Sequence, residues 1–156
     1  MQRYPPTVVV RHRKENLKKC SLRGLESRED FTFYRYPDTA PSSLAGYIVL
    51  TLDAPELSIA DAEHPLCLID ATWRYAATME QVLEQQGAFD GAILRSLPAH
   101  YRTAYPRRQE ACTDPDRGLA SVEALYLAYL TLGRCTDGLL DQYHWAAEFK
   151  QLNSLI

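Results

Sequence analysis

Residues 66–73 read LCLIDATW, four apolar residues followed by an acid, a small residue, a hydroxyl and a tryptophan. An apolar run of this length between Pro65 and Asp70 is typical of a buried strand. Asp70 is then the last residue of the strand and a suitable N-cap for a helix that begins near Ala71. Because ligands collect at the carboxyl ends of strands in open α/β sheets, Asp70 and Trp73 also suit a small-molecule site. The stretch alone leaves both interpretations open, a helix cap beside a core tryptophan or a ligand site.

The composition is that of one globular domain. With 156 residues, 46% hydrophobic and 24% charged, the chain can bury a full core. It has no apolar run long enough to cross a membrane and no signal-peptide core at its N-terminus, so we expect a cytoplasmic protein. The four cysteines form no Cys-x-x-Cys pair and the four histidines add no metal-ligand spacing, so we expect free thiols and no metal.

Charge is unevenly distributed along the chain. Residues 1–36 hold nine Lys or Arg and four Asp or Glu, whereas the remaining residues hold eight basic and sixteen acidic ones. A basic end on an acidic body suggests contact with a polyanion at one edge, although a solvated surface has the same composition. We divide the single domain into a basic N-terminal region (residues 1–45) and a ligand-binding region (residues 46–156).

Apolar and β-branched runs alternate with helical patterns. We predict strands at 7–10, 31–36, 47–52, 66–70 and 92–95, and helices at 71–86, 122–132 and 137–153. Ser58 and Asp61 have the spacing of a capping box, and Ser121 is placed to cap the second helix. Buried strands that alternate with helices predict an α/β domain with a mostly parallel sheet.

Residues 100–117 are the least regular stretch of the sequence. Arg102, Arg107 and Arg108 lie near Tyr101 and Tyr105. Such a combination suits a nucleic-acid backbone with a stacked base, but an ordinary exposed loop has the same composition.

Six short motifs in a fixed order make the chain recognisable. They are KKCS (18–21), LSIAD (57–61), DATW (70–73), RSLP (95–98), LASVEAL (119–125) and HWAAEFKQLN (144–153). Together they resemble the ribosome-biogenesis 18S rRNA aminocarboxypropyltransferase family over most of the chain.

Two departures point to a second family. Thr72 stands where the first family has serine, and an arginine-rich loop follows Pro98 in place of the family's Asn-Pro-Val-Asn-Tyr segment. Both features are more similar to the DTW-domain tRNA-uridine aminocarboxypropyltransferases, whose cysteine-rich metal site is absent from this sequence. The chemistry is common to the two families, whereas the RNA substrate differs.

The resemblance implies a SPOUT-like fold with a C-terminal trefoil knot that binds S-adenosylmethionine (SAM). It implies transfer of the 3-amino-3-carboxypropyl (acp) group of SAM to N3 of a uridine or modified pseudouridine in ribosomal RNA, by a protein that is usually monomeric. The alternatives are transfer to tRNA, a SPOUT methyltransferase, and a non-catalytic RNA-binding ribosome-assembly factor on the same fold.

The resemblance also implies site residues. Those expected to bind SAM are Ser21, Leu50, Leu52, Ile69, Asp70, Trp73, Ala76, Leu97, Leu119 and Ser121. Asp70 would bind a cationic group of the ligand or accept the N3 proton as the catalytic base; exposure at a strand end next to a cation favours an ionised, positioning carboxylate. Glu123, Trp145 and Asn153 match family positions, and we interpret them as structural. The RNA-facing candidates are Arg11, Arg13, Lys14, Lys18, Lys19, Arg102, Arg107 and Arg108.

Overall fold

The computed structural model describes residues 5–14, 22–71, 73–104 and 119–155, with the backbone alone for Trp73 and Arg74. The strands among these residues are β1 (Thr7–His12), β2 (Phe31–Tyr36), β3 (Ile48–Leu50), β4 (Leu66–Asp70) and β5 (Ile93–Arg95). The helices are α1 (Trp73–Gln85), α2 (Ser121–Thr131) and α3 (Ala146–Leu152), with short 3-10 turns η1 (Leu25–Ser27) and η2 (Ile59–Asp61).

The five strands form one sheet in the order β2-β1-β4-β3-β5, and every neighbouring pair is parallel. The predicted α/β class with a mostly parallel sheet is therefore confirmed. Because all strands run the same way, their carboxyl ends lie along one edge of the sheet, where ligands bind in folds of this kind.

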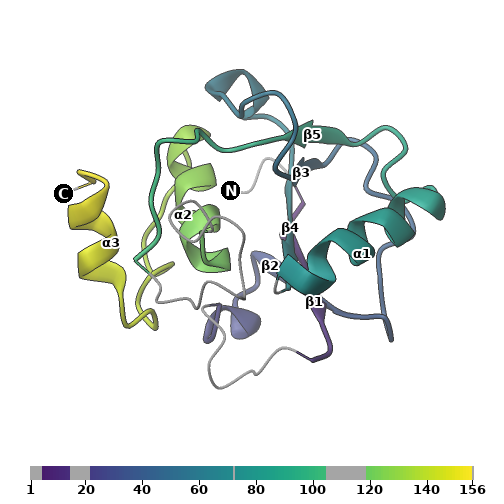
Figure 1. The fold of residues 1–156 in the computed structure, drawn as a ribbon, viewed down its shortest axis with the longest axis horizontal. Helices are drawn as coiled ribbons and strands as arrows, with labels where there is room; N and C mark the ends of the chain where they lie inside the picture. The colour runs from purple at the N-terminus through teal and green to yellow at the C-terminus, as the bar shows by residue number, and fades with distance from the viewer. Residues whose placement is uncertain (1–4, 15–21, 72, 105–118, 156) are drawn as a thin grey trace.

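Helices cover both faces of the sheet, with α1 on one side and α2 and α3 on the other (Figure 1). Successive residues of a strand point to opposite faces. Val9 and Leu68 accordingly pack with α2, whereas Val10 and Cys67 pack on the opposite face with Met79 of α1. This two-sided burial explains why the strands read as continuous apolar runs.

Helix α2 lies between the sheet and α3, and it is apolar all round for that reason. Leu125 and Leu127 are both fully buried. The ring of Tyr126 meets the ring of Phe149 from α3 edge-on, with centroids 6.1 Å apart. The prediction that this helix is buried on most sides is confirmed.

Several predicted bounds need correction. The strands predicted at 31–36 and 66–70 are observed with those ends. The first strand, predicted at 7–10, extends to His12. Two other strands are shorter than predicted: residues 48–50 replace 47–52, and residues 93–95 replace 92–95. Helix α1 begins at Trp73 rather than Ala71.

The largest error concerns the last helix. The chain from residue 136 to 146 forms a series of turns closed by bonds between residues three apart, such as Leu139 N to Thr136 O, and Gly138 has φ +82°. Leu139, Leu140 and Tyr143 are buried at a spacing that resembles a helix, but α3 itself begins only at Ala146.

Candidate functional site

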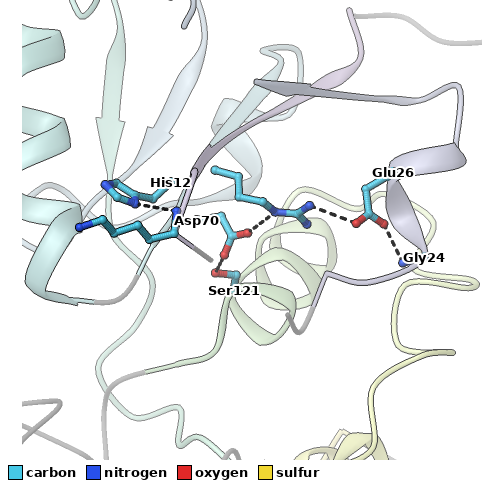
Figure 2. A network of polar contacts seen from close by, with 7 residues as sticks. His12, Gly24, Glu26, Asp70 and Ser121 are labelled. Carbon is cyan, nitrogen blue, oxygen red and sulfur yellow. Dashed lines mark hydrogen bonds and ion pairs between the residues drawn. The ribbon is translucent and has the colours of Figure 1, made fainter. Parts of the chain in front are cut away.

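Asp70 ends β4, the middle strand of the sheet, and its carboxylate joins a network of polar contacts (Figure 2). Its Oδ2 accepts a hydrogen bond from Nε of Arg11 at 3.0 Å, and its Oδ1 accepts one from Oγ of Ser121 at 2.6 Å. Only 4% of Asp70 is exposed. The expectation of an exposed carboxylate is therefore wrong: Arg11 and Ser121 close over it from β1 and the start of α2.

Arg11 reaches Asp70 because β1 and β4 are neighbours and the two residues are paired in register. Strand alternation turns Arg11 to the same face as Val9, which is the face that α2 covers. Its Nη1 donates to Oε2 of Glu26 at 3.0 Å, and its guanidinium lies 4.7 Å from the centre of the Phe33 ring. The Arg11 side chain is 8% exposed and that of Glu26 is 38% exposed. The network thus runs from a buried acid through a buried cation to an acid near the surface.

Glu26 is the outer charged end of this network. Burial raises the pKa of Glu26, but hydrogen bonds from its own backbone, from Arg11 and from the Gly24 amide, together with the charge of Arg11, lower it below its ordinary value. The Gly24 bond measures 2.8 Å from N to Oε1. With both acids ionised and Arg11 protonated, the three side chains carry one net negative charge.

Ser121 is the first residue of α2, and the N-cap is Ala120. The predicted cap is therefore wrong by one position. The backbone amide of Ala120 donates instead to the carboxylate of Glu123 at 2.7 Å. Because an ionised carboxylate only accepts hydrogen bonds, Ser121 donates its single hydroxyl proton to Asp70.

Glu123 ties three separate segments together. Its carboxylate is fully buried and accepts bonds from Thr103 Oγ1 (2.6 Å), the Ala104 amide (2.9 Å), the Ala120 amide and the Tyr143 hydroxyl (2.9 Å). These four hydrogen bonds compensate the burial of the carboxylate. The structural role expected for Glu123 agrees with this arrangement.

The other face of β1 ends in aromatic contacts. The ring of His12 stacks on that of Tyr75 from α1 with centroids 4.2 Å apart and planes 11° apart. The Lys14 amide donates to Nδ1 of His12 at 3.1 Å, which requires that nitrogen to be unprotonated. Burial, then the charges of Lys14 and Arg13, lower the pKa of His12, so the imidazole is neutral at pH 7.

The similarity of this chain to known proteins lies in its fold. No protein-family model and no curated protein sequence matches the chain. A solved structure that does match is that of the SAM-dependent rRNA:acp-transferase Tsr3 from Vulcanisaeta distributa. The two proteins are 22% identical, the TM-score is 0.69, and the match covers 96% of this chain and 79% of that one. The chain has the fold of Tsr3.

Eight of the ten predicted SAM-binding residues have side chains that the structure describes, and all eight lie near the carboxyl ends of the strands. They lie at the end of β3, β4 or β5 or shortly after it, in the first turn of α1, or at or just before the start of α2: Leu50, Leu52, Ile69, Asp70, Ala76, Leu97, Leu119 and Ser121. Leu50 is buried in the core, whereas Leu52, two residues further, is 89% exposed. Ser21 and the side chain of Trp73 lie outside the described residues.

Two of the sequence motifs meet at this edge. Ser58 and Asp61 form the predicted capping box around η2, with the Ser58 amide 3.2 Å from Oδ2 of Asp61. That oxygen also pairs with Nε of Arg95 at 3.1 Å, so LSIAD contacts RSLP.

The RNA-facing candidates divide into two groups. Arg13, Lys14 and Arg102 are exposed, and Asn153 holds the backbone of Arg102 by bonds to both its N and its O (2.8 Å each). Arg11 is buried and paired, so its guanidinium belongs to the Asp70 network rather than to an RNA-facing surface. The other candidates, Lys18, Lys19, Arg107 and Arg108, lie outside the described residues.

The sequence interpretation missed the pairing of Arg11 with Asp70 and the contribution of Glu26. Alternation along β1 does place Arg11 on one face with Val9, but nothing near Arg11 in the sequence indicates that β4 is the neighbouring strand. Glu26 belongs to none of the six motifs, so no sequence signal indicated it.

The described residues contain neither a membrane-spanning helix nor a metal site. None of the helices there has the length and apolar character needed to span a membrane. Within the same residues, no three His, Cys, Asp or Glu side chains come together in a way that could hold a metal ion.

Proposed function

We propose that the protein transfers the acp group of SAM to N3 of a uridine or modified pseudouridine in ribosomal RNA. The observation that carries the proposal is the buried, doubly hydrogen-bonded Asp70 at the carboxyl end of the middle strand, in a chain with the fold of an rRNA:acp-transferase. A carboxylate held at this edge suits a cationic ligand or a proton in transfer.

When bound, SAM supplies an electrophilic carbon: the sulfur–Cγ bond breaks, N3 bonds to Cγ, methylthioadenosine leaves, and the N3 proton passes to a base. Asp70 would either hold the ammonium or sulfonium charge of the ligand or accept that proton. Ser121 was expected to hold the ligand's carboxylate, but its only hydroxyl proton is donated to Asp70. Its remaining lone pairs suit the ammonium group, so Asp70 and Ser121 together form an acceptor site for a cation.

The nearby residues fit the rest of SAM. Leu52 offers an exposed apolar side chain at the carboxyl edge, beside the buried Leu50, and we propose that these two residues and Trp73 flank the adenine. Backbone groups of Ile69, Leu97 and Leu119 would bind adenine and ribose. Ala76 in the first turns of α1 would bind the ligand's carboxylate, which a helix N-terminus favours, and Ser21 would bind the ribose.

We propose that RNA binds along the exposed basic residues. These are Arg13, Lys14 and Arg102, together with Lys18, Lys19, Arg107 and Arg108. Phosphate contacts of this kind give affinity without base selection, so RNA binding should weaken steeply as salt rises.

The test uses SAM labelled in two positions. Wild-type protein is incubated with small-subunit rRNA and with tRNA, using SAM radiolabelled either in the carboxyl carbon or in the methyl group. We expect the carboxyl label, and not the methyl label, to enter rRNA. In parallel, calorimetry measures SAM binding to wild type, Asp70→Asn and the exposed control Arg35→Gln.

Each outcome separates the candidates. Methyl label in RNA would indicate a methyltransferase, and carboxyl label in tRNA alone would favour the tRNA enzyme. Folded wild-type protein that does not bind SAM would favour the non-catalytic RNA-binding factor. Asp70→Asn with normal SAM affinity and no transfer would identify Asp70 as the base, whereas lost affinity would identify it as a ligand to the cation.

The remaining expectations belong to this proposal too. We propose a SPOUT-like trefoil knot around the SAM site, a basic N-terminal region (residues 1–45) that serves RNA, and a monomer that acts in the cytoplasm. The likeness to Tsr3 supports the fold on which these proposals rest.

A further inference from the structure

Arg11 is the cation beside Asp70, and it is held on two sides. It uses Nε for Asp70 and Nη1 for Glu26, both at 3.0 Å. Asp70 and Arg11 are almost excluded from water, with side chains 5% and 8% exposed. A buried carboxylate at a ligand site is stable as an anion only if a nearby group compensates its desolvation.

We propose that Arg11 is a positioning residue that holds the Asp70 carboxylate turned toward Ser121, with Glu26 anchoring the far side of its guanidinium. This inference rests on the proposed function, in which Asp70 faces a cationic group of SAM or the N3 proton. Arg11 acts through Asp70 rather than on a reacting group, since its Nε and its Nη1 both bond to carboxylates of the protein.

The geometry requires arginine rather than any cation. The guanidinium presents Nε and Nη1 in one rigid plane, and each bonds to a different acid. Its position 4.7 Å from the centre of the Phe33 ring restricts that plane further. A lysine at this position has one nitrogen on a flexible stem, so it supplies the charge without fixing both carboxylates.

The charged and polar groups around Asp70 come from several neighbouring elements. Arg11 approaches from β1 and Glu26 from η1, while α2 contributes Ser121 and the buried Glu123, whose oxygens are engaged by other donors. His12 is the next residue of β1 and lies on the opposite face, where burial and the charges of Lys14 and Arg13 lower its pKa. A variant of His12 therefore serves as a control for substitutions of Arg11.

The test compares SAM with methylthioadenosine, which lacks the amino-acid portion and the sulfonium charge. Calorimetry measures both affinities for wild type, Arg11→Gln, Arg11→Lys, His12→Gln and Arg35→Gln. Arg35 is the matched control, because it pairs in register with Arg11 on the neighbouring strand but is exposed. Thermal unfolding shows which variants are folded.

We expect Arg11→Gln to bind SAM roughly tenfold more weakly than wild type, because the Asp70 carboxylate loses the bond that holds it toward Ser121. Methylthioadenosine affinity should stay within about twofold of wild type, since that ligand does not meet the carboxylate. Arg11→Lys keeps the charge without the two bonds, so it should bind SAM several-fold more weakly than wild type. His12→Gln and Arg35→Gln should leave SAM affinity unchanged.

If Arg11→Gln does not fold, Arg11→Lys decides: weaker SAM binding with normal methylthioadenosine binding supports the proposal. Equal losses of both affinities in the Arg11 variants, or an equal loss of SAM affinity in His12→Gln, would overturn it while the proposed function stands. Absence of SAM binding by folded wild-type protein would instead overturn the proposed function itself.

Discussion

The two faces of β1 end in different chemistry at the same edge of the sheet. Arg11 points to the α2 face, where it joins two acids, and His12 points to the α1 face, where it stacks on Tyr75. The two residues are consecutive, and strand alternation turns their side chains to opposite faces of the sheet. One strand thus supplies a fixed charge to a candidate site on one face and an aromatic contact to the core on the other.

The energetic basis of the two faces differs as well. On the α2 face, buried charges are stable only while each keeps its partners, so removing one group leaves another unpaired. On the α1 face, apolar and ring contacts add up without such dependence, so a loss there scales with the volume removed. Substitutions on the two faces should therefore differ in size and in how far a conservative replacement rescues them.

The largest loss of stability is expected for Glu123→Ala on the α2 face. It removes the common acceptor of the Ala104 and Ala120 amides and of two hydroxyls, and two of these donors, the Ala120 amide and the Tyr143 hydroxyl, stay buried. We expect a free energy of unfolding lower by about 3–5 kcal/mol, measured by urea denaturation. Glu148→Ala, an exposed acid in α3, is the control and should change it by less than about 0.5 kcal/mol. A loss for Glu123→Ala no larger than that of the control would mean that the buried carboxylate is not needed.

On the α1 face, Met79→Ala should lower the free energy of unfolding by about 2–4 kcal/mol. Met79 is 1% exposed and packs with Cys67 and Val10, so the shorter side chain leaves a cavity. Met79→Leu keeps nearly the same volume and should lose less than about 1.5 kcal/mol in the same denaturation experiment. If both substitutions were equally severe, this face would depend on a specific contact rather than on volume.

A smaller effect, which changes with pH, is expected for His12→Gln. The pKa of His12 in the folded protein is below its ordinary 6.5, because of burial and of Lys14 and Arg13. As pH falls through 6.5, the unfolded chain takes up a proton that the folded protein does not, so wild type loses stability. His12→Gln should be less stable at neutral pH, through the lost stacking, but should lose less on acidification. Unfolding midpoints at several pH values test this, with the exposed His144→Gln as control. Parallel pH curves for His12→Gln and wild type would contradict the assignment.

The strands and α2 could be predicted because their signals are local. The run 66–70 is buried on both faces, and its ends were predicted to the residue. The turns from residue 136 to 146 could not be predicted, because Leu139, Leu140 and Tyr143 repeat at helical spacing although Gly138 takes a left-handed conformation. Spacing alone does not distinguish a helix from a chain of turns that bury the same residues.

The candidate site was also predictable only in part. Asp70 and Ser121 were recognised from their motifs, but their direct bond joins residues 51 apart in sequence. The partnership of Arg11 with Asp70 depends on the order of strands in the sheet, which local patterns do not encode. Arg11 was therefore grouped with the RNA-facing residues, since a basic residue in a basic segment has the same composition whether its side chain is buried or exposed.

The smallest expected effect is a difference in reactivity between two thiols, one on the buried α1 face and one in an exposed turn. Cys67 is fully buried on β4, and burial raises its pKa to about 12, whereas Cys135 is exposed. Because the thiolate is the reactive form, iodoacetamide at about pH 8 should alkylate Cys135 in the folded protein and leave Cys67 unmodified until the protein unfolds. Peptide mass spectrometry with and without urea measures both sites. Alkylation of Cys67 in folded protein at the rate of Cys135 would mean that the α1 face opens to solvent, and the stability loss predicted for Met79→Ala should then be smaller too.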